Sequence, residues 1–317
     1  MTDFAFATCL PGMETALKRE VLRDRAQLRF AYSRPGFITF RSEKTLSPDD
    51  ESPTSFAWVW GQSLGPARDP ADAAHQLALT RANRVHLFAR DADVDITPWR
   101  DAIQLPTGPS ENGELVADVV LAPDEPAWLG LHRADARHLA WPGGRIPIDV
   151  PSDVPSRAFA KIEEAIAWRQ LPIAAGQVAL EVGAAPGGAV MALARRGLTV
   201  FAVDTADLAP QVLAMPNVRH LRTKVGALRW EELPARVDWL LLDVNLAPQV
   251  ALHEIARIVP RLREHLRGAV LTLKLNEWRF VDELGALRER IVQMGFRDVQ
   301  LRHLPSNRRE VCAVALC

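Results

Sequence analysis

Residues 178–204 read Val-Ala-Leu-Glu-Val-Gly-Ala-Ala-Pro-Gly-Gly-Ala-Val-Met-Ala-Leu-Ala-Arg-Arg-Gly-Leu-Thr-Val-Phe-Ala-Val-Asp. The stretch starts with a short apolar run, passes through a glycine-rich turn and a segment of helical composition, and ends in a second apolar run closed by an acid. This order predicts a strand–helix–strand unit that holds a nucleoside. The expected parts are a strand at 178–182, a turn at 183–188, a helix at 189–196 and a strand at 198–203.

The turn has the residue types of a nucleoside-binding loop. Its glycines allow a tight bend and a close approach to a ligand, and the start of the following helix offers unpaired N–H groups. Asp204 lies 21 residues after Gly183, which suits a carboxylate that accepts the hydroxyls of a ribose. Dinucleotide and S-adenosylmethionine sites share this pattern, but Glu181 and the alanine at 185, where G-x-G-x-x-G needs glycine, favour S-adenosylmethionine. The expected cofactor-binding residues are Glu181, Gly183, Ala184, Ala185, Pro186, Gly187, Gly188 and Asp204.

Composition limits the possible classes of protein. The 317 residues allow two domains with cores of their own, and 48% of them are hydrophobic. No apolar run approaches the ~20 residues of a membrane helix, and the first residues do not resemble a secretory signal. We therefore expect a cytoplasmic protein without a membrane partner. The three cysteines and eight histidines show no metal-type spacing, so we expect neither a disulfide framework nor a metal site.

Charge is distributed unevenly along the chain. Residues 1–150 carry 16 basic and 21 acidic side chains, whereas residues 151–317 carry 22 and 18. This mild basic excess excludes a protein that coats nucleic acid by charge alone, so any RNA contact must rely on local patches and shape. Only five of the 38 basic residues are lysines, which makes a lysine in the second half informative because it can give up its proton and arginine cannot.

Residues 1–150 predict a small α+β domain. A Pro-rich segment at 141–155 reads as a linker, which places the domain boundary near 140–155. Residues 43–55 are interpreted as a mobile loop. The acidic stretch 91–114 is not assigned to a helix or a strand. Strands are expected at 4–9, 28–32, 37–41, 84–88, 116–121 and 128–131, and helices at 15–25 and 71–80.

Residues 151–317 predict a second, Rossmann-like domain. Ser156 is expected to cap a helix whose apolar positions share one face. Beyond residue 204 strands and helices keep alternating, which indicates an α/β fold with a parallel sheet and helices on both faces. Strands are expected at 218–221, 239–242, 269–273, 299–304 and 310–316, and helices at 249–266 and 280–294.

Charged residues follow several of these strands. Asp204, Asp243 and Lys274 each stand at a carboxyl end, where ligands bind in doubly wound sheets. A tight reversal at 305–307 makes the last strand antiparallel, so its first residue, Glu310, falls on the same edge. Lys161, on the helix ahead of the first strand, reaches the same place. Phosphate contacts are considered for Arg157, Arg302, His303, Arg308 and Arg309.

The order Lys161, Asp243, Lys274, Glu310, together with Glu-Val-Gly-Ala-Ala-Pro-Gly-Gly, resembles the FtsJ-like ribose 2′-O-methyltransferases, whose hallmark is a Lys-Asp-Lys-Glu tetrad. The resemblance extends from about residue 155 to residue 311. It implies a class I methyltransferase fold, S-adenosylmethionine as cofactor and RNA as partner. The chain looks most like members of the family that modify a cytidine of large-subunit (23S) ribosomal RNA.

Two details extend the resemblance. The stretches 9–14 and 128–132 are similar to the amino-terminal RNA-binding region of such enzymes, described as ferredoxin-like plus a THUMP module, which implies that role for residues 1–150. Lys224 follows the third strand where these enzymes often carry an aspartate near the adenine, and we assign Lys224 and Asp243 to the cofactor site as well. The sequence indicates no protein partner.

The chemistry needs these residue types. A ribose 2′-hydroxyl must lose its proton as it attacks the methyl carbon, and a neutral Lys274 can accept that proton. The pKa of lysine, ordinarily ~10.4, would have to fall toward ~7–8. Lys161 and a sulfonium favour this, while Asp243 and Glu310 oppose it. We expect Asp243 to bridge the lysines, and Glu310 to align Lys161 and the hydroxyl.

Other functions remain open at this point. The same fold could methylate another RNA, a small molecule or a protein without needing the tetrad. A dinucleotide oxidoreductase would bind NAD in place of S-adenosylmethionine. A noncatalytic RNA-binding relative would keep the cofactor pocket but transfer no methyl group.

Overall fold

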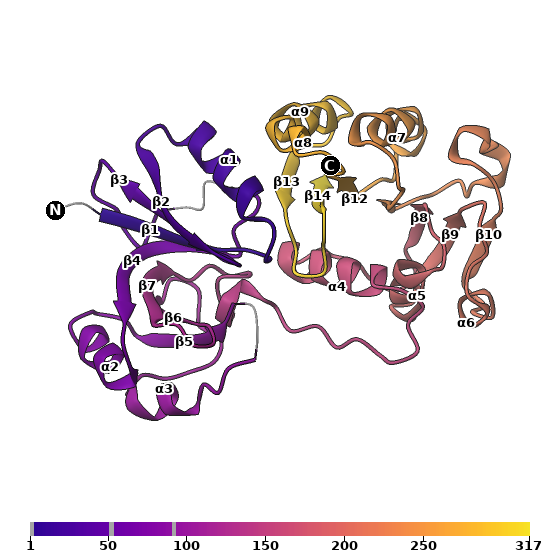
Figure 1. Cartoon of the computed structure of the whole chain (residues 1–317). Helices are drawn as coiled ribbons and strands as arrows, with labels where there is room; N and C mark the ends of the chain where they lie inside the picture. The colour runs from indigo at the N-terminus through magenta and orange to yellow at the C-terminus, as the bar shows by residue number, and fades with distance from the viewer. Residues whose placement is uncertain (1–2, 51–53, 91–92) are drawn as a thin grey trace. The chain divides into compact units, whose positions relative to one another are not determined.

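The structure is a computed structural model that describes residues 3–50, 54–90 and 93–317. It divides into two compact units, Met1–Ile146 and Pro147–Cys317 (Figure 1). The loop predicted at 43–55 and the unassigned stretch 91–114 fall partly outside the described residues. No helix in the described ranges combines the length and the apolar character needed to cross a membrane.

The first unit is an α+β fold. Its described strands form one sheet in the order β2-β3-β1-β4-β7-β6-β5, in which only β5 and β6 pair in parallel. The strands are β1 (Asp3–Thr8), β2 (Leu28–Arg34), β3 (Phe37–Ser42), β4 (Val59–Ala67), β5 (Arg84–Ala89), β6 (Leu115–Leu121) and β7 (Ala127–Arg133), and the helices are α1 (Glu14–Asp24), α2 (Pro70–Ala78), α3 (Thr97–Ala102) and the 3₁₀ turn η1 (Pro142–Gly144).

Strand β4 was not predicted, because two glycines and a proline interrupt its sequence. The structure gives a packing reason for one of the glycines. A Cβ on Gly61 would lie 2.4 Å from the carbonyl oxygen of Leu131 and 2.8 Å from the ring of Phe6. The second glycine, Gly65, lies where the pairing register between β4 and β7 shifts.

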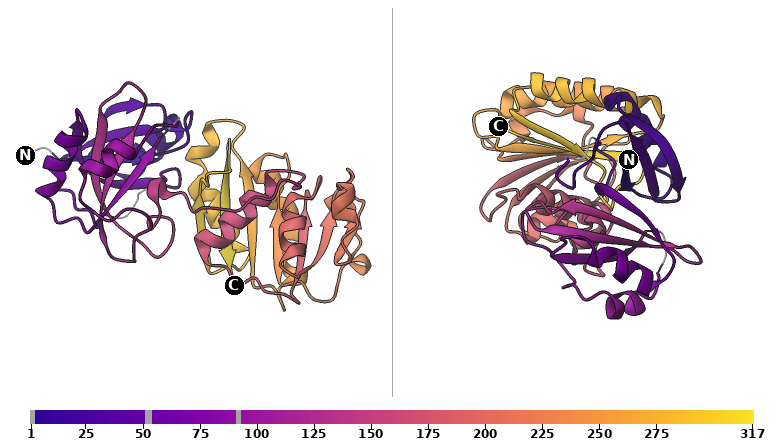
Figure 2. Two further views of the ribbon diagram at one scale, coloured as in Figure 1. Left: turned by 90° about the horizontal axis from the view of Figure 1, so that it is seen from below. Right: turned by 90° about the vertical axis from the view of Figure 1, so that its left-hand side faces the viewer.

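The second unit has the predicted doubly wound architecture. Its sheet order is β10-β9-β8-β11-β12-β14-β13, and all neighbours are parallel except β14, which is antiparallel to both β12 and β13. Helices α4 and α5 cover one face, and α7 and α9 cover the other (Figures 1 and 2).

These elements agree closely with the predicted ranges. The strands are β8 (Val178–Val182), β9 (Thr199–Val203), β10 (Val218–Leu221), β11 (Trp239–Leu242), β12 (Gly268–Lys274), β13 (Asp298–Arg302) and β14 (Glu310–Leu316). The helices are α4 (Ala158–Arg169), α5 (Gly188–Arg195), α6 (Pro210–Leu213), α7 (Pro248–Leu262), α8 (Arg279–Asp282) and α9 (Leu284–Gln293), with 3₁₀ turns η2 (Val225–Ala227) and η3 (Trp230–Glu232).

The start of α4 differs from the expected cap. Arg157 occupies the N-cap position, and the helix has no side-chain cap. The Ser156 hydroxyl instead accepts a hydrogen bond from the N–H of Ala158, at 3.3 Å. Ser156 therefore lies one residue ahead of the capping position.

The turn between β13 and β14 makes the predicted reversal. The Leu304 N–H donates to the side-chain oxygen of Asn307 at 2.9 Å, and the Asn307 N–H donates back to the Leu304 carbonyl. From α4, the carboxylate of Glu164 accepts hydrogen bonds from the N–H and the hydroxyl of Ser306. The turn is thereby fixed, and in the resulting register Glu310 lies directly opposite Lys274.

Candidate active site

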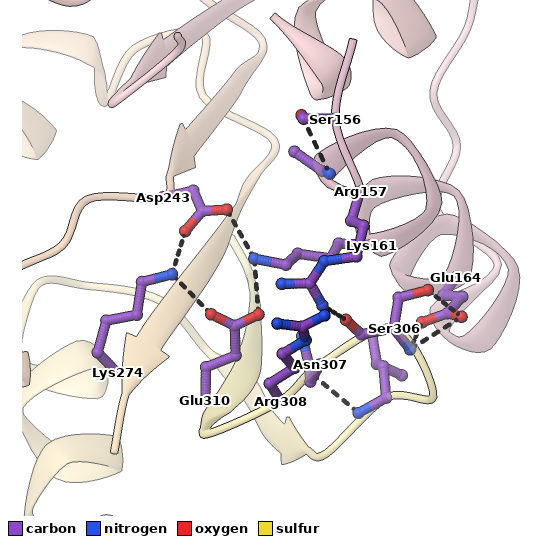
Figure 3. Close-up of polar contacts among 12 residues, drawn as sticks. Ser156, Arg157, Lys161, Glu164, Asp243, Lys274, Ser306, Asn307, Arg308 and Glu310 are labelled. Atoms are coloured by element: carbon purple, nitrogen blue, oxygen red, sulfur yellow. Dashed lines mark hydrogen bonds and ion pairs between the residues drawn. The ribbon is translucent and has the colours of Figure 1, made fainter. Parts of the chain in front are cut away.

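The structure brings the four predicted tetrad residues together at the carboxyl edge of the second sheet (Figure 3). Lys274 is the last residue of β12, Glu310 is the first of β14, and Asp243 follows β11 directly. Lys161 reaches them from the first turns of α4. Sequence reasoning placed these side chains at one edge because parallel strands end there and the closing strand runs backward.

The four side chains form a ring of alternating charge. Lys161 Nζ lies 2.9 Å from Asp243 Oδ2 and 2.6 Å from Glu310 Oε1. Lys274 Nζ lies 2.7 Å from Asp243 Oδ1 and 2.6 Å from Glu310 Oε2. Each of the four carboxylate oxygens therefore contacts one amine, and the formal charges cancel. The side chains are between 7% and 20% exposed, so the ring is shielded but open to a ligand.

The ring determines the protonation of Lys274. Burial lowers the pKa of Lys274, but the neighbouring carboxylates of Asp243 and Glu310 outweigh burial, and the net pKa lies above its ordinary value. Burial alone would raise the pKa of Glu310. The opposite effect of the two lysines is larger, so the net pKa of Glu310 is lowered. The fall in the pKa of Lys274 that proton acceptance requires is opposed within the ring, because the two acids lie within hydrogen-bond distance of its amine.

The glycine-rich loop contacts more protein than we expected. Gly183 has a φ of +82°, and a Cβ there would lie 2.4 Å from the Asp243 carbonyl oxygen, so only glycine fits beside the end of β11. A Cβ on Gly188 would lie 2.3 Å from the Ser156 hydroxyl, and one on Gly187 would lie 2.9 Å from the side chain of Val212. Packing against the start of α4 and against α6 therefore accounts for the second and third glycines.

A cavity of about 730 Å³ opens beside the loop, a size typical of small-molecule sites. Of the predicted cofactor residues, Gly183, Ala185, Asp204, Lys224 and Asp243 line it. Glu181, Ala184, Pro186, Gly187 and Gly188 do not line it. Sequence reasoning missed Thr205, Thr223, Asn245, Leu246 and Glu254 among its lining residues; Thr205 and Asn245 follow strand ends closely, whereas Glu254 lies on α7 and has no sequence signal.

Asp204 connects the loop to the end of β9. Its Oδ2 accepts from the N–H of Ala185 and its Oδ1 from the N–H of Ala206, both at 2.9 Å. A carboxylate oxygen has two lone pairs, so each can still accept a hydrogen bond from a ligand hydroxyl. Asp204 can therefore fix the loop and bind a ribose together.

Glu181 lies behind the loop. It is 1% exposed, and its Oε2 has no hydrogen-bond partner among the residues that the structure describes. Burial and the nearby Asp243 and Asp204 raise the pKa of Glu181 well above its usual range. Glu181 lines a second cavity, of about 20 Å³, together with Lys161 and Asp243. Asp243 is the one residue that lines both of these cavities, so it links the ring to the larger pocket.

The candidate phosphate contacts divide into two groups. Arg302 is 5% exposed and His303 fully buried, so neither reaches an external phosphate, which corrects that expectation. Arg157 and Arg308 are exposed beside the ring, and Arg157 donates to the Ser306 carbonyl at 3.2 Å (Figure 3). Arg309 is also exposed and stacks over Trp278.

The second unit combines a doubly wound sheet and a glycine loop with an acid after the second strand and a lysine–acid ring at the carboxyl edge. These features together define a nucleoside-dependent methyltransferase domain. Residues 154–310 match the family model described as FtsJ-like methyltransferase. The second unit is therefore an FtsJ-like methyltransferase domain.

Curated relatives carry the name ribosomal RNA large subunit methyltransferase M. The chain is 34% identical over 215 residues to the protein of Thauera aminoaromatica, covering 64% of this chain and 57% of that one. It is 37% identical over 183 residues to the protein of Halorhodospira halophila, covering 53% and 51%. The chain thus spans about half the length of these relatives. A solved structure of a putative ribosomal RNA methyltransferase from Plasmodium falciparum is 15% identical, with a TM-score of 0.36 over 51% of this chain and 96% of that chain.

Proposed function

We propose that this protein uses S-adenosylmethionine to methylate a ribose 2′-oxygen of RNA, and that its target is a cytidine of large-subunit ribosomal RNA. The observation that carries the proposal is the ring of Lys161, Asp243, Lys274 and Glu310 at the edge of the cavity. The names of the relatives support the large-subunit target. The tetrad resemblance supports a ribose 2′-oxygen as acceptor, and the likeness to family members that modify a cytidine supports that nucleotide. The proposed place of action is the cytoplasm.

The cavity fits the proposed cofactor. Asp204 would accept the ribose hydroxyls, the loop residues Gly183 and Ala185 would lie along the nucleoside, and Lys224 borders the same space. The acids that line this pocket, Asp204, Asp243 and Glu254, favour a ligand that carries positive charge. When bound, the cofactor supplies a methyl group on a cationic sulfur.

Each residue of the ring has a separate role in the proposed reaction. Lys274 accepts the proton of the 2′-hydroxyl, which it can do only as a neutral amine. Asp243 and Glu310 hold both lysines in place, and Lys161 supplies the second positive charge of the ring. We further propose that residues 1–150 form an RNA-binding, THUMP-like domain, and that residues 151–317 carry out the transfer.

The test is to map 2′-O-methyl groups in ribosomal RNA from cells with and without the gene. We expect loss of one 2′-O-methylcytidine in large-subunit RNA, restored by the wild-type gene. An unchanged map would exclude this target. Calorimetry with S-adenosylmethionine and NAD on the purified chain separates a methyltransferase from an oxidoreductase, and tight S-adenosylmethionine binding without transfer to any RNA would favour a noncatalytic relative.

The substitution Glu310→Gln is expected to shift the pH dependence of methyl transfer to lower pH. In the wild type kcat/KM should rise with pH, because the carboxylates raise the pKa of Lys274 and the base must be neutral. Removing one of these charges lowers the pKa of Lys274, so the rise in kcat/KM begins at lower pH. The value of kcat/KM at high pH should fall by roughly 10-fold, because Lys161 and Lys274 lose a hydrogen-bond partner.

The measurement is kcat/KM on RNA across a pH series. Glu277→Gln serves as the control, because Glu277 is exposed and pairs with Arg279 outside the ring. A pH profile for Glu310→Gln that coincides with that of the wild type would mean that Glu310 does not influence the pKa of Lys274.

A further inference from the structure

The first unit contains a buried cluster of His86, Asp118 and His132 that the proposed methyl transfer does not use. The three residues lie on the neighbouring strands β5, β6 and β7. His86 pairs directly with Asp118 across β5 and β6, and Asp118 pairs with Gly130, two residues before His132. Because side chains alternate along a strand, all three lie on the same face of the sheet. They are at most 1% exposed.

The cluster contains polar atoms that have no hydrogen-bond partner in the described part of the chain. Neither ring nitrogen of His86 has a hydrogen-bond partner among the described residues, and the same holds for Asp118 Oδ1. Buried polar groups are almost always paired, so three unpaired atoms at one place call for a ligand. One ligand atom from each residue can be chosen so that all lie within 4.8 Å of one another.

The surroundings of His132 match those of a metal-binding histidine. Its Nε2 lies 3.0 Å from the carbonyl oxygen of Leu139, so this nitrogen carries the proton that it donates. Its Nδ1 lies 2.5 Å from Asp118 Oδ2, so a proton lies between these two atoms, and a bound cation would displace that proton. A histidine that binds a metal through one nitrogen typically donates the other N–H to a carbonyl in this way.

We propose that His86, Asp118 and His132 bind a divalent transition-metal cation, for which zinc is the best match. Two imidazoles and a carboxylate form a ligand set typical of zinc, and the fourth position is left to a water molecule. One ligand atom from each residue lies within 4.8 Å of the others. Tetrahedral ligands at zinc distances lie roughly 3.4 Å apart, so His132 Nδ1 and Asp118 Oδ2, at 2.5 Å, would have to move apart on binding. A single cation would bind one ring nitrogen of His86 and the carboxylate of Asp118, and the second nitrogen of His86 would carry a proton.

The proposed role is structural. Through His132 and Leu139 the cation would fix the three strands to the segment that follows β7, and this segment ends at the boundary after Ile146. The site lies wholly within the first unit, so it does not depend on the proposed methyl transfer.

The test uses the untagged full-length chain with Cys317→Ser, because Cys317 is an exposed thiol that could bind zinc by itself. After chelator treatment, zinc is added, and bound metal is measured by mass spectrometry together with the thermal unfolding midpoint. We expect one zinc per chain and a higher midpoint, since a ligand that binds only the folded state stabilises it. Cobalt added instead should give the visible absorption of a four-coordinate site.

Two variants test the ligand assignment. Asp118→Asn should lower zinc affinity by about 100-fold or more, and His86→Cys should keep metal binding and add a thiolate-to-cobalt charge-transfer band. His75→Gln, in the same unit but exposed, should bind zinc like the parent. If the variants do not fold, the stoichiometry and cobalt spectrum of the parent decide. A parent without bound zinc, or zinc lost only with His75→Gln, would overturn the proposal and leave His132 and Asp118 as an ion pair.

Discussion

Replacing Lys274 with alanine is expected to lower methyl transfer to RNA by about 10²- to 10⁴-fold, the usual contribution of a positioned acid or base. The amine of Lys274 is the proposed proton acceptor, and no other lysine replaces it at the end of β12. Binding of S-adenosylmethionine should change much less, because Lys274 lies outside the larger cavity. Single-turnover rates on total RNA, with cofactor affinity from calorimetry, give both quantities.

The variant Lys274→Arg separates proton transfer from charge. Arginine keeps the positive charge beside Asp243 and Glu310, but its guanidinium does not release a proton in proteins. We therefore expect Lys274→Arg to be nearly as inactive as Lys274→Ala. Near wild-type transfer by Lys274→Arg would mean that the ring acts through charge alone, and would remove Lys274 from the role of base.

The substitution Asp243→Asn is expected to lower methyl transfer by at least ~100-fold and also to weaken cofactor binding. Asp243 accepts from both lysines and lines both cavities. Without its charge the ring carries a net charge of +1, and the larger cavity loses a carboxylate that favours a cationic ligand. Breaking a fully buried ion pair costs about 3–5 kcal/mol, and the partial exposure of this ring reduces the cost to roughly 1–3 kcal/mol of folding stability.

A matched control exists at the other end of the same strand. Asp238 stands directly before β11, is fully buried, and pairs with Arg236 and Arg267. Asp238→Asn should also lower stability in urea unfolding, yet the folded fraction should transfer methyl groups at the wild-type rate. Equal loss of activity in both variants would mean that strand integrity, and not the carboxylate at the ligand edge, explains the effect of Asp243→Asn.

Local patterns were sufficient to predict the second unit. Its strands are short apolar runs, each closed by a turn or a charged residue, and their alternation with helices leaves few possible topologies. The antiparallel course of β14 followed from the turn at 305–307, and the meeting of Lys274 with Glu310 followed from that course. The structure places both as predicted.

Features that depend on packing could not be predicted. Strand β4 contains Gly61 because Phe6 and Leu131 approach it, and a single sequence does not show that contact. The glycines at 187 and 188 fit protein neighbours where a ligand was expected. The buried cluster in the first unit joins three strands whose residues are 32 and 14 positions apart, without any metal-type spacing.

Strand β14 raises a question of register. Its first six residues are buried, so the usual alternation of apolar and polar positions is missing, and sliding by one residue would hide nearly as much apolar surface. The register is fixed by Glu164, which binds Ser306 in the preceding turn although neither residue lines either of the two cavities at the site. The length of the segment between β13 and β14 therefore sets the register of β14. Adding or removing one residue in this segment would shift Glu310 along the sheet. We therefore expect relatives to differ in the residue types of this segment but to keep its length.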